Sequence, residues 1–173
     1  AVQDADVLDA LKKEIPELAG ATMHVDDWAG TRSFAEGALS GAVSGIHLFC
    51  DTDIFAAVYA TNLLLRASDL LVTKPSELAY YPVPKLHVKR VGGHEAWGAI
   101  RSAEQGDGSV ECRTIEDTLS MLGLLLDGRE GLELMNANIL SANAAGIYNG
   151  AYRAVDIARG IDKELSNEVS RRK

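Results

Sequence analysis

The chain has 173 residues and a net charge of −8 at neutral pH, with 47% hydrophobic and 24% charged residues. This length supports one domain with a sizeable core. No apolar run approaches the roughly 20 residues of a membrane-spanning helix. The acidic balance argues against a nucleic-acid partner, because phosphate backbones bind to basic faces.

The N-terminal sequence and the cysteines indicate the compartment. The chain begins AVQDADVLDALKKE, which has none of the features of a signal peptide. Cys50 and Cys112 lie far apart, outside any metal-ligand spacing, and each follows a strand-like run. We therefore expect two buried free thiols in a cytoplasmic protein, with no metal site.

Helices and strands alternate in the first 66 residues. An apolar stripe predicts a helix over residues 4–19 that Gly20 ends. A helix over residues 34–43 is predicted to begin at a cap formed by Thr31 or Ser33. The remaining elements are short strands over residues 21–25 and 46–49, and an apolar helix that begins at residues 51–53 and runs to residue 66.

The chain is organised around residues 69–100, DLLVTKPSELAYYPVPKLHVKRVGGHEAWGAI. Two predicted strands, at residues 70–72 and 85–91, are each followed by polar residues and a predicted helix, and Ser76 is placed as the first helix cap. In open α/β sheets such adjacent strand-to-helix turns bind ligands, and helix N-termini favour anions. We predict a binding site formed by Lys74, Ser76, Glu77, Gly93, His94 and Glu95.

The rest of the chain is predicted to be mainly helical. A strand over residues 110–113 leads to a helix that Thr114 and Asp117 open as a capping box. One face of this helix is kept apolar by Ile115, Leu119, Leu122 and Leu126. Residues 131–165 form one long helix or two consecutive ones. The amides of Asn136, Asn138, Asn143 and Asn149 in this segment suggest close packing against another element, such as a partner domain or a second subunit, but a plain surface helix is the commoner arrangement for such a sequence.

The alternation predicts an α/β fold, a doubly wound, mostly parallel sheet with helices on both faces and a helical C-terminal segment. We expect residues 1–173 to form a single Rossmann-like domain. Such a domain usually starts with a strand, whereas this chain starts with a helix. We therefore expect it to lack a first strand and an N-terminal partner domain.

The residues of this central stretch resemble a known family. Thr73-Lys74-Pro75, Ser76-Glu77-Leu78, Pro84, Gly93-His94-Glu95 and Gly98-Ala99 occur in the order of motifs in GT-B-fold glycosyltransferases. The similarity is to their C-terminal, donor-binding half, as found in diacylglycerol sugar transferases and the peptidoglycan N-acetylglucosaminyltransferase. It covers about residues 46–140, with specific motifs at 66–99.

The resemblance implies a function and a role for each site residue. The chain would bind a UDP-sugar, whose hexosyl unit passes to an acceptor such as a lipid without a metal ion or other cofactor. Glu77 would hold the ribose hydroxyls, Lys74 a phosphate, and His94 and Glu95 the sugar hydroxyls. The catalytic base would come from the missing N-terminal acceptor domain, which would also provide any peripheral membrane contact.

A second hypothesis is a non-catalytic relative. The family's Gly-Gly pair is absent between Pro75 and Ser76, and His94 and Gly98 replace a glutamine and an asparagine. Such a domain would keep the fold and bind a nucleotide, a sugar phosphate or only a partner protein. An unrelated α/β enzyme is a third alternative, but the sequence contains no catalytic triad or Walker loop to support it.

Overall fold

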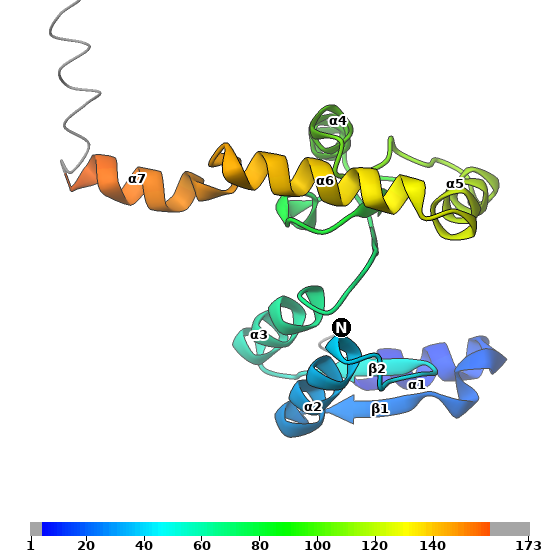
Figure 1. Ribbon diagram of the computed structural model, residues 1–173. Helices are drawn as coiled ribbons and strands as arrows, with labels where there is room; N and C mark the ends of the chain where they lie inside the picture. The colour runs from blue at the N-terminus through cyan, green and yellow to red at the C-terminus, as the bar shows by residue number, and fades with distance from the viewer. Residues whose placement is uncertain (1–4, 160–173) are drawn as a thin grey trace, which may run out of the picture. The chain divides into compact units, whose positions relative to one another are not determined.

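The computed structural model describes residues 5–159, which divide into two compact units (Figure 1). One unit ends at Asp69 and the other begins at Leu70. The prediction of one domain over residues 1–173 stays a prediction. Within the described residues, no helix has both the length and the apolar character needed to cross a membrane.

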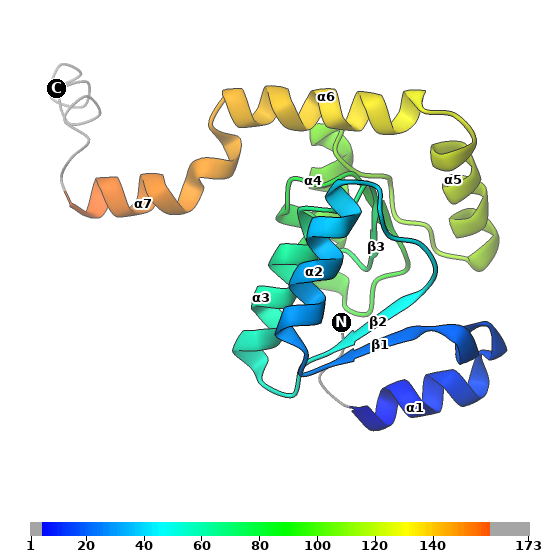
Figure 2. The ribbon, with the colours of Figure 1, turned by 60° about the horizontal axis from the view of Figure 1, so that its bottom comes forward.

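The first unit contains two parallel strands and three α-helices. Its elements are α1 (Ala5–Glu14), the 3₁₀ turn η1 (Pro16–Gly20), β1 (Thr22–Val25), α2 (Trp28–Leu39), β2 (His47–Cys50) and α3 (Ile54–Leu65). β1 and β2 pair from Thr22–His47 to Val25–Cys50. Contacts join α1 to β2, and α2 to both β1 and α3 (Figure 2).

Two predicted boundaries in this unit are wrong. The first α-helix ends at Glu14 rather than residue 19, and a 3₁₀ turn follows, because Pro16 has no N–H to continue the helical ladder. Asp27, not Thr31 or Ser33, caps α2, and its carboxylate accepts a hydrogen bond from Gly30 N at 2.9 Å. Asp53 caps α3, which confirms the predicted start of that helix.

The second unit also contains a parallel strand pair. Its elements are β3 (Leu71–Thr73), η2 (Glu77–Tyr80), β4 (Lys85–His87), η3 (Gly93–Glu95), α4 (Ala96–Gln105), α5 (Ile115–Asp127), α6 (Glu130–Ala144), η4 (Ile147–Asn149) and α7 (Gly150–Ala158). β3 and β4 pair from Leu71–Lys85 to Thr73–His87. Parallel bridges from Lys85 to Gly108 and from Val88 to Cys112 place a third segment beside β4.

Two strands of this unit are shorter than predicted. β4 ends at His87 rather than residue 91, and residues 110–113 contribute an isolated bridge instead of a regular strand. The protein is mixed α/β, mainly helical, with its strands in two small parallel sheets. This confirms the predicted class and the parallel pairing at that coarser level.

The core of the second unit lies between β4 and α5. Leu86, Cys112 and Leu125 are buried together, and Met121 and Leu122 pack against them. Of the apolar face predicted on α5, only Leu122 packs against this core, whereas Ile115, Leu119 and Leu126 are all more than half exposed. The Thr114–Asp117 capping box is confirmed by reciprocal hydrogen bonds of 3.0 and 3.2 Å.

The C-terminal segment consists of two consecutive helices, α6 and α7, rather than the one long helix that was the other prediction. Gly146 has φ 76°, a left-handed conformation that ends α6 and begins the η4 turn before α7. Residues 160–165 of the predicted helix lie outside the described residues. Asn138 donates a 3.0 Å hydrogen bond to the Gly106 carbonyl, so this amide packs against a turn of the same unit.

Candidate functional site

The first turn of the candidate site follows β3. Pro75 is buried, and Ser76 N donates to the Lys74 carbonyl at 2.8 Å. Ser76 was predicted as a helix cap, but its side chain makes no capping bond and the turn that follows is only the four-residue η2. Pro82 and Pro84 stop this turn from lengthening into an α-helix, because each proline removes an N–H donor and restricts the residue before it.

The second turn follows β4 and is closed by Glu95. Its Oε2 accepts hydrogen bonds from Val91 N at 2.8 Å and Gly92 N at 3.1 Å. The Glu95 side chain is only 7% exposed. The turn then continues through η3 directly into α4, so Glu95 fixes the entry to that helix.

An ion pair joins the two turns. Lys74 Nζ lies 2.5 Å from Glu95 Oε1. This contact, followed by the amides of Gly92 and Val91, lowers the pKa of Glu95 to about 2. The carboxylate therefore stays charged over the physiological range and holds the Lys74 ammonium at the carboxyl ends of two neighbouring parallel strands.

Gly98 provides the second link between the turns. A Cβ at this position would lie 3.4 Å from both the Ala79 Cβ and the Pro75 carbonyl oxygen. The start of α4 therefore packs closely on the turn that follows β3, within van der Waals distance of Pro75 and Ala79.

The predicted site residues differ in how the structure places them. Lys74 and Glu95 are in contact, and Ser76 is half-buried beside them in the chain. Gly93 and His94 are exposed at the start of η3. The His94 ring lies against Gly92, because a Cβ added to Gly92 would be 2.6 Å from His94 Cε1. The backbone of Glu77 opens η2, and its side chain lies outside the described structure.

A cleft of ≈ 290 Å³ opens beside the second turn, between α4 and residues 110–113. Its charged lining residues are paired with one another. The Glu111 carboxylate accepts a 3.1 Å hydrogen bond from the backbone amide of Arg90. It also forms ion pairs with the side chains of Arg90, at 3.1 Å, and Arg113, at 3.4 Å. The Arg90 amide, and then the charge of the Arg90 side chain, lower the pKa of Glu111.

A buried ion pair lies at the amino end of β4, and no local sequence pattern predicted it. Lys85 Nζ lies 3.0 Å from Asp107 Oδ2, and both side chains are at most 1% exposed. The ammonium also donates to the Tyr81 and Val83 carbonyls at 2.7 and 2.9 Å. Burial lowers the pKa of Lys85, and the bond to Asp107 opposes that shift.

Asp107 connects this pair to two helical elements. Its Oδ1 accepts a 2.6 Å bond from Ser102 of α4, and its Oδ2 a 3.0 Å bond from the hydroxyl of Tyr148 in η4. Burial and then the Asp107 contact raise the pKa of Tyr148 to about 12. In the sequence, Gly106-Asp107-Gly108 has the composition of an exposed turn, and a buried lysine is rare, so neither residue signalled the pair.

His87 lies next to this pair and is completely buried. Within residues 5–159 no well-formed hydrogen bond reaches either ring nitrogen, and the Thr73 backbone provides only a weak polar contact. Burial and then the charge of Lys85 lower its pKa to about 4, so the ring is neutral at physiological pH. The prediction of a core histidine is confirmed.

A further side-chain contact with the backbone lies in the first unit. Asp26, which has φ 48°, accepts hydrogen bonds from the Thr52 amide and hydroxyl, and burial raises the pKa of the neighbouring Asp51. No set of three or more His, Cys, Asp or Glu side chains in residues 5–159 is arranged to hold a metal ion. Cys50 and Cys112 are both buried and neither forms a disulfide, as predicted.

Comparison with known proteins adds a family. Residues 2–159 match the family described as "Domain of unknown function (DUF6938)", which spans most of the chain. The chain belongs to this family. Neither the curated proteins nor the solved structures include a significant match to the DUF6938 chain.

Proposed function

We propose that the second unit, from residue 70, is a nucleotide-sugar-binding domain of a GT-B-like glycosyltransferase. The observation that carries this proposal is the Lys74–Glu95 ion pair, which holds a cation where two adjacent parallel strands end. A fixed ammonium at that edge is suited to a diphosphate. The resemblance of residues 66–99 to donor-binding motifs supports the same ligand.

The finer fold prediction belongs to this proposal. β3, β4 and residues 108–112 lie in consecutive order and are parallel, as in one half of a doubly wound sheet. We take these segments as part of a Rossmann-like, GT-B-type arrangement. The helices α4 and α5 follow the second and third of them, as such an arrangement requires.

Each residue has a defined role in the proposed site. Lys74 contacts the diphosphate, Glu77 the two ribose hydroxyls, and Ser76, Gly93 and His94 the ligand from the turns. Because both carboxylate oxygens of Glu95 already have protein partners, we assign it to positioning Lys74 and the second turn. It acts through those groups rather than on a sugar hydroxyl.

The proposed reaction transfers a hexosyl unit from a UDP-sugar to an acceptor hydroxyl, such as that of a lipid. The bond from the anomeric carbon to the phosphate oxygen breaks, and a bond to the acceptor oxygen forms. The acceptor proton passes to a base on a separate acceptor domain, and UDP leaves with the bonding electron pair. Lys74 stabilises the charge that develops on the departing diphosphate.

A non-catalytic binding domain is the second candidate. Two observations favour it: η2 begins directly after Pro75-Ser76, without a Gly-Gly turn, and Glu95 is fully engaged by the protein. Such a domain would bind a nucleotide, a sugar phosphate or a partner protein without transferring a sugar.

Isothermal titration calorimetry with UDP and UDP-hexoses tests the proposal. We expect the full chain to bind UDP, and Lys74→Met and Glu77→Ala each to weaken binding by about tenfold or more, equivalent to about 1.4 kcal/mol. Lys89→Met, which removes an exposed lysine just after β4, is the matched control and should bind normally. The absence of heat with every nucleotide would reject the donor site and favour the partner-binding form of the second candidate.

A further inference from the structure

Helix α5 has two apolar faces. One face is buried in the core of the second unit through Leu125. The other carries Ile115, Leu119 and Leu126, which are 80%, 61% and 59% exposed. Their positions in the helix place them in one stripe along its axis. Scattered apolar residues are ordinary on a protein surface, whereas a stripe of large apolar side chains on one helix is typical of an interaction surface.

The N-terminal half of this stripe lies beside a cleft of ≈ 340 Å³. Ile115 and Leu119 line the cleft together with Val88 and Cys112, which a β-bridge joins. Leu126 lies in the last turn of α5, about 16 Å from Ile115 along the helix axis. The same stripe therefore has an apolar cleft at one end and an exposed leucine at the other.

The charged groups beside the two ends of the stripe have opposite signs. Lys89 and Arg113 line the cleft, and both are exposed. Arg113 lies 3.4 Å from Glu111, but that carboxylate is only 9% exposed and has a closer arginine partner. At the other end of the stripe, the exposed Asp127 ends α5, and the last carbonyl groups of the helix add partial negative charge.

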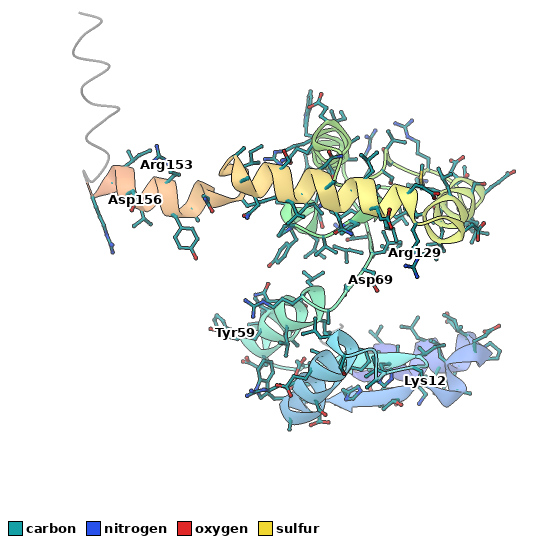
Figure 3. The ribbon with its side chains drawn as sticks, in the orientation of Figure 1. Lys12, Tyr59, Asp69, Arg129, Arg153 and Asp156 are labelled. Carbon is teal, nitrogen blue, oxygen red and sulfur yellow. The ribbon has the colours of Figure 1, made fainter. Side chains whose placement is uncertain are left out.

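A second pair of opposite charges lies at the two ends of α5. Glu116 is exposed in the first turn of the helix, and Arg129 is exposed just after the helix ends, at the start of α6 (Figure 3). The other acidic residue of the first turn, Asp117, closes the capping box and lines a different cleft. Each end of α5 therefore presents an exposed arginine and an exposed carboxylate.

We infer that this stripe binds a second copy of the chain, with the two α5 helices antiparallel across a two-fold axis. Leu126 of each copy enters the cleft of the other beside Ile115, and Leu119 lies near the axis. The face that provides the cleft also provides the side chain that fills it, as a two-fold interface requires. Together with the half-buried Leu122, the stripe has the alternating spacing of three and four positions with which neighbouring helices pack side by side.

The charges favour a second copy over a lipid bilayer or an apolar peptide. In the antiparallel pair, Asp127 of each copy lies near Arg113 of the other. Arg129 of each copy likewise lies near Glu116 of the other, and the two-fold axis repeats both attractions. An anionic bilayer would be repelled by the two carboxylates, and an uncharged peptide would leave all these charges without partners. The inference does not depend on the proposed function.

Sedimentation equilibrium of the full chain tests the inference, and we expect a reversible equilibrium between monomer and dimer at micromolar concentrations. Leu119→Asp and Leu126→Asp should each weaken dimerisation by about tenfold or more, because each would bury a carboxylate in an apolar interface. Leu124→Asp is the matched control, since Leu124 is 69% exposed on the opposite side of the same helix and should not affect dimerisation. Circular dichroism checks that each variant is folded.

Charge reversal tests the antiparallel register. Arg113→Glu and Asp127→Arg should each weaken the dimer several-fold, and the double variant Arg113→Glu/Asp127→Arg should restore it, because the partners are then exchanged across the two-fold axis. The inference is overturned if the wild type stays a monomer at submillimolar concentration, or if Leu126→Asp dimerises as tightly as the wild type. It is also overturned if the double charge reversal associates no better than the single variants. UDP binding, measured separately, tests the proposed function and is independent of these results.

Discussion

Lys74 and Glu95 are 21 positions apart in the sequence, yet Nζ and Oε1 lie 2.5 Å apart and connect the ends of two adjacent parallel strands. Glu95 is buried and receives two backbone amides as well, whereas almost half of the Lys74 side chain remains exposed. The pair therefore has a fixed member and an accessible member. This asymmetry is the basis for assigning positioning to Glu95 and ligand contact to Lys74.

Glu95→Gln should weaken UDP binding about tenfold, because the neutral amide cannot hold the Lys74 ammonium by charge and offers only one acceptor oxygen. The variant should also melt at a lower temperature than the wild type, as followed by circular dichroism. Glu104→Gln, an exposed carboxylate on α4, is the control and should change neither property. Normal UDP affinity in Glu95→Gln would show that Lys74 does not need this partner.

Lys85→Met should destabilise the fold by about 3–5 kcal/mol, because it leaves the Asp107 carboxylate buried without its cation. The double variant Lys85→Met/Asp107→Leu should recover part of that loss, since it removes both charges. Urea unfolding of the wild type, both single variants and the double variant gives the coupling energy. If the losses in unfolding free energy of the two single variants simply add up in the double variant, Lys85 and Asp107 do not interact directly.

Stability should fall as the pH is lowered from about 6.5 to 4 because of His87. Its pKa is 6.5 when unperturbed and about 4 in the folded protein, so the unfolded chain binds a proton first. The free energy of unfolding should then decrease by about 3 kcal/mol across this range, and the stabilisation is complete only above pH 6.5.

The variant His87→Leu separates this effect from other titrations. It removes the buried ring, so its unfolding free energy should depend less steeply on pH between 4 and 6.5. His94→Leu removes an exposed ring of the same unit and should keep the wild-type dependence. Equal pH dependence in wild type and His87→Leu, measured by urea unfolding, would argue against a neutral buried His87.

Gly108→Ala should destabilise the protein by about 1–3 kcal/mol through overpacking. A Cβ there would lie 2.2 Å from Ser102 Oγ and 3.1 Å from His87 Nε2. Gly93→Ala is the matched control, because a Cβ at Gly93 has nothing within 4 Å. Thermal unfolding of the two variants compares them directly, and equal melting temperatures would contradict the tight packing around Asp107.

Local sequence patterns predicted the order of most elements because those signals are short-range. The Thr114–Asp117 capping box and the start of α3 after Asp53 depend on residues three positions apart, and both predictions are confirmed. The prediction for Ser76 is wrong, because two prolines a few residues later decide the length of η2. Ile115 and Leu119 have helical spacing, but the core selects the neighbouring face of α5.

The charged interior was not predictable from local patterns. Lys85 pairs with Asp107, 22 positions later, and Asp107 with Tyr148, 41 positions later. Only the fold brings these residues together, and composition normally assigns lysine and Gly-Asp-Gly to the surface. The Lys74–Glu95 contact was anticipated more closely, since adjacent parallel strands bring their following turns to the same edge.

Backbone amide NMR of the full chain titrated with UDP tests the central claim, that the edge joined by Lys74 and Glu95 binds a nucleotide diphosphate. The predicted result is saturable shifts confined mainly to residues 73–77 and 91–95, and their loss in Lys74→Met. Saturable shifts centred elsewhere in the chain, or none at UDP concentrations that saturate known nucleotide-binding domains, would contradict it.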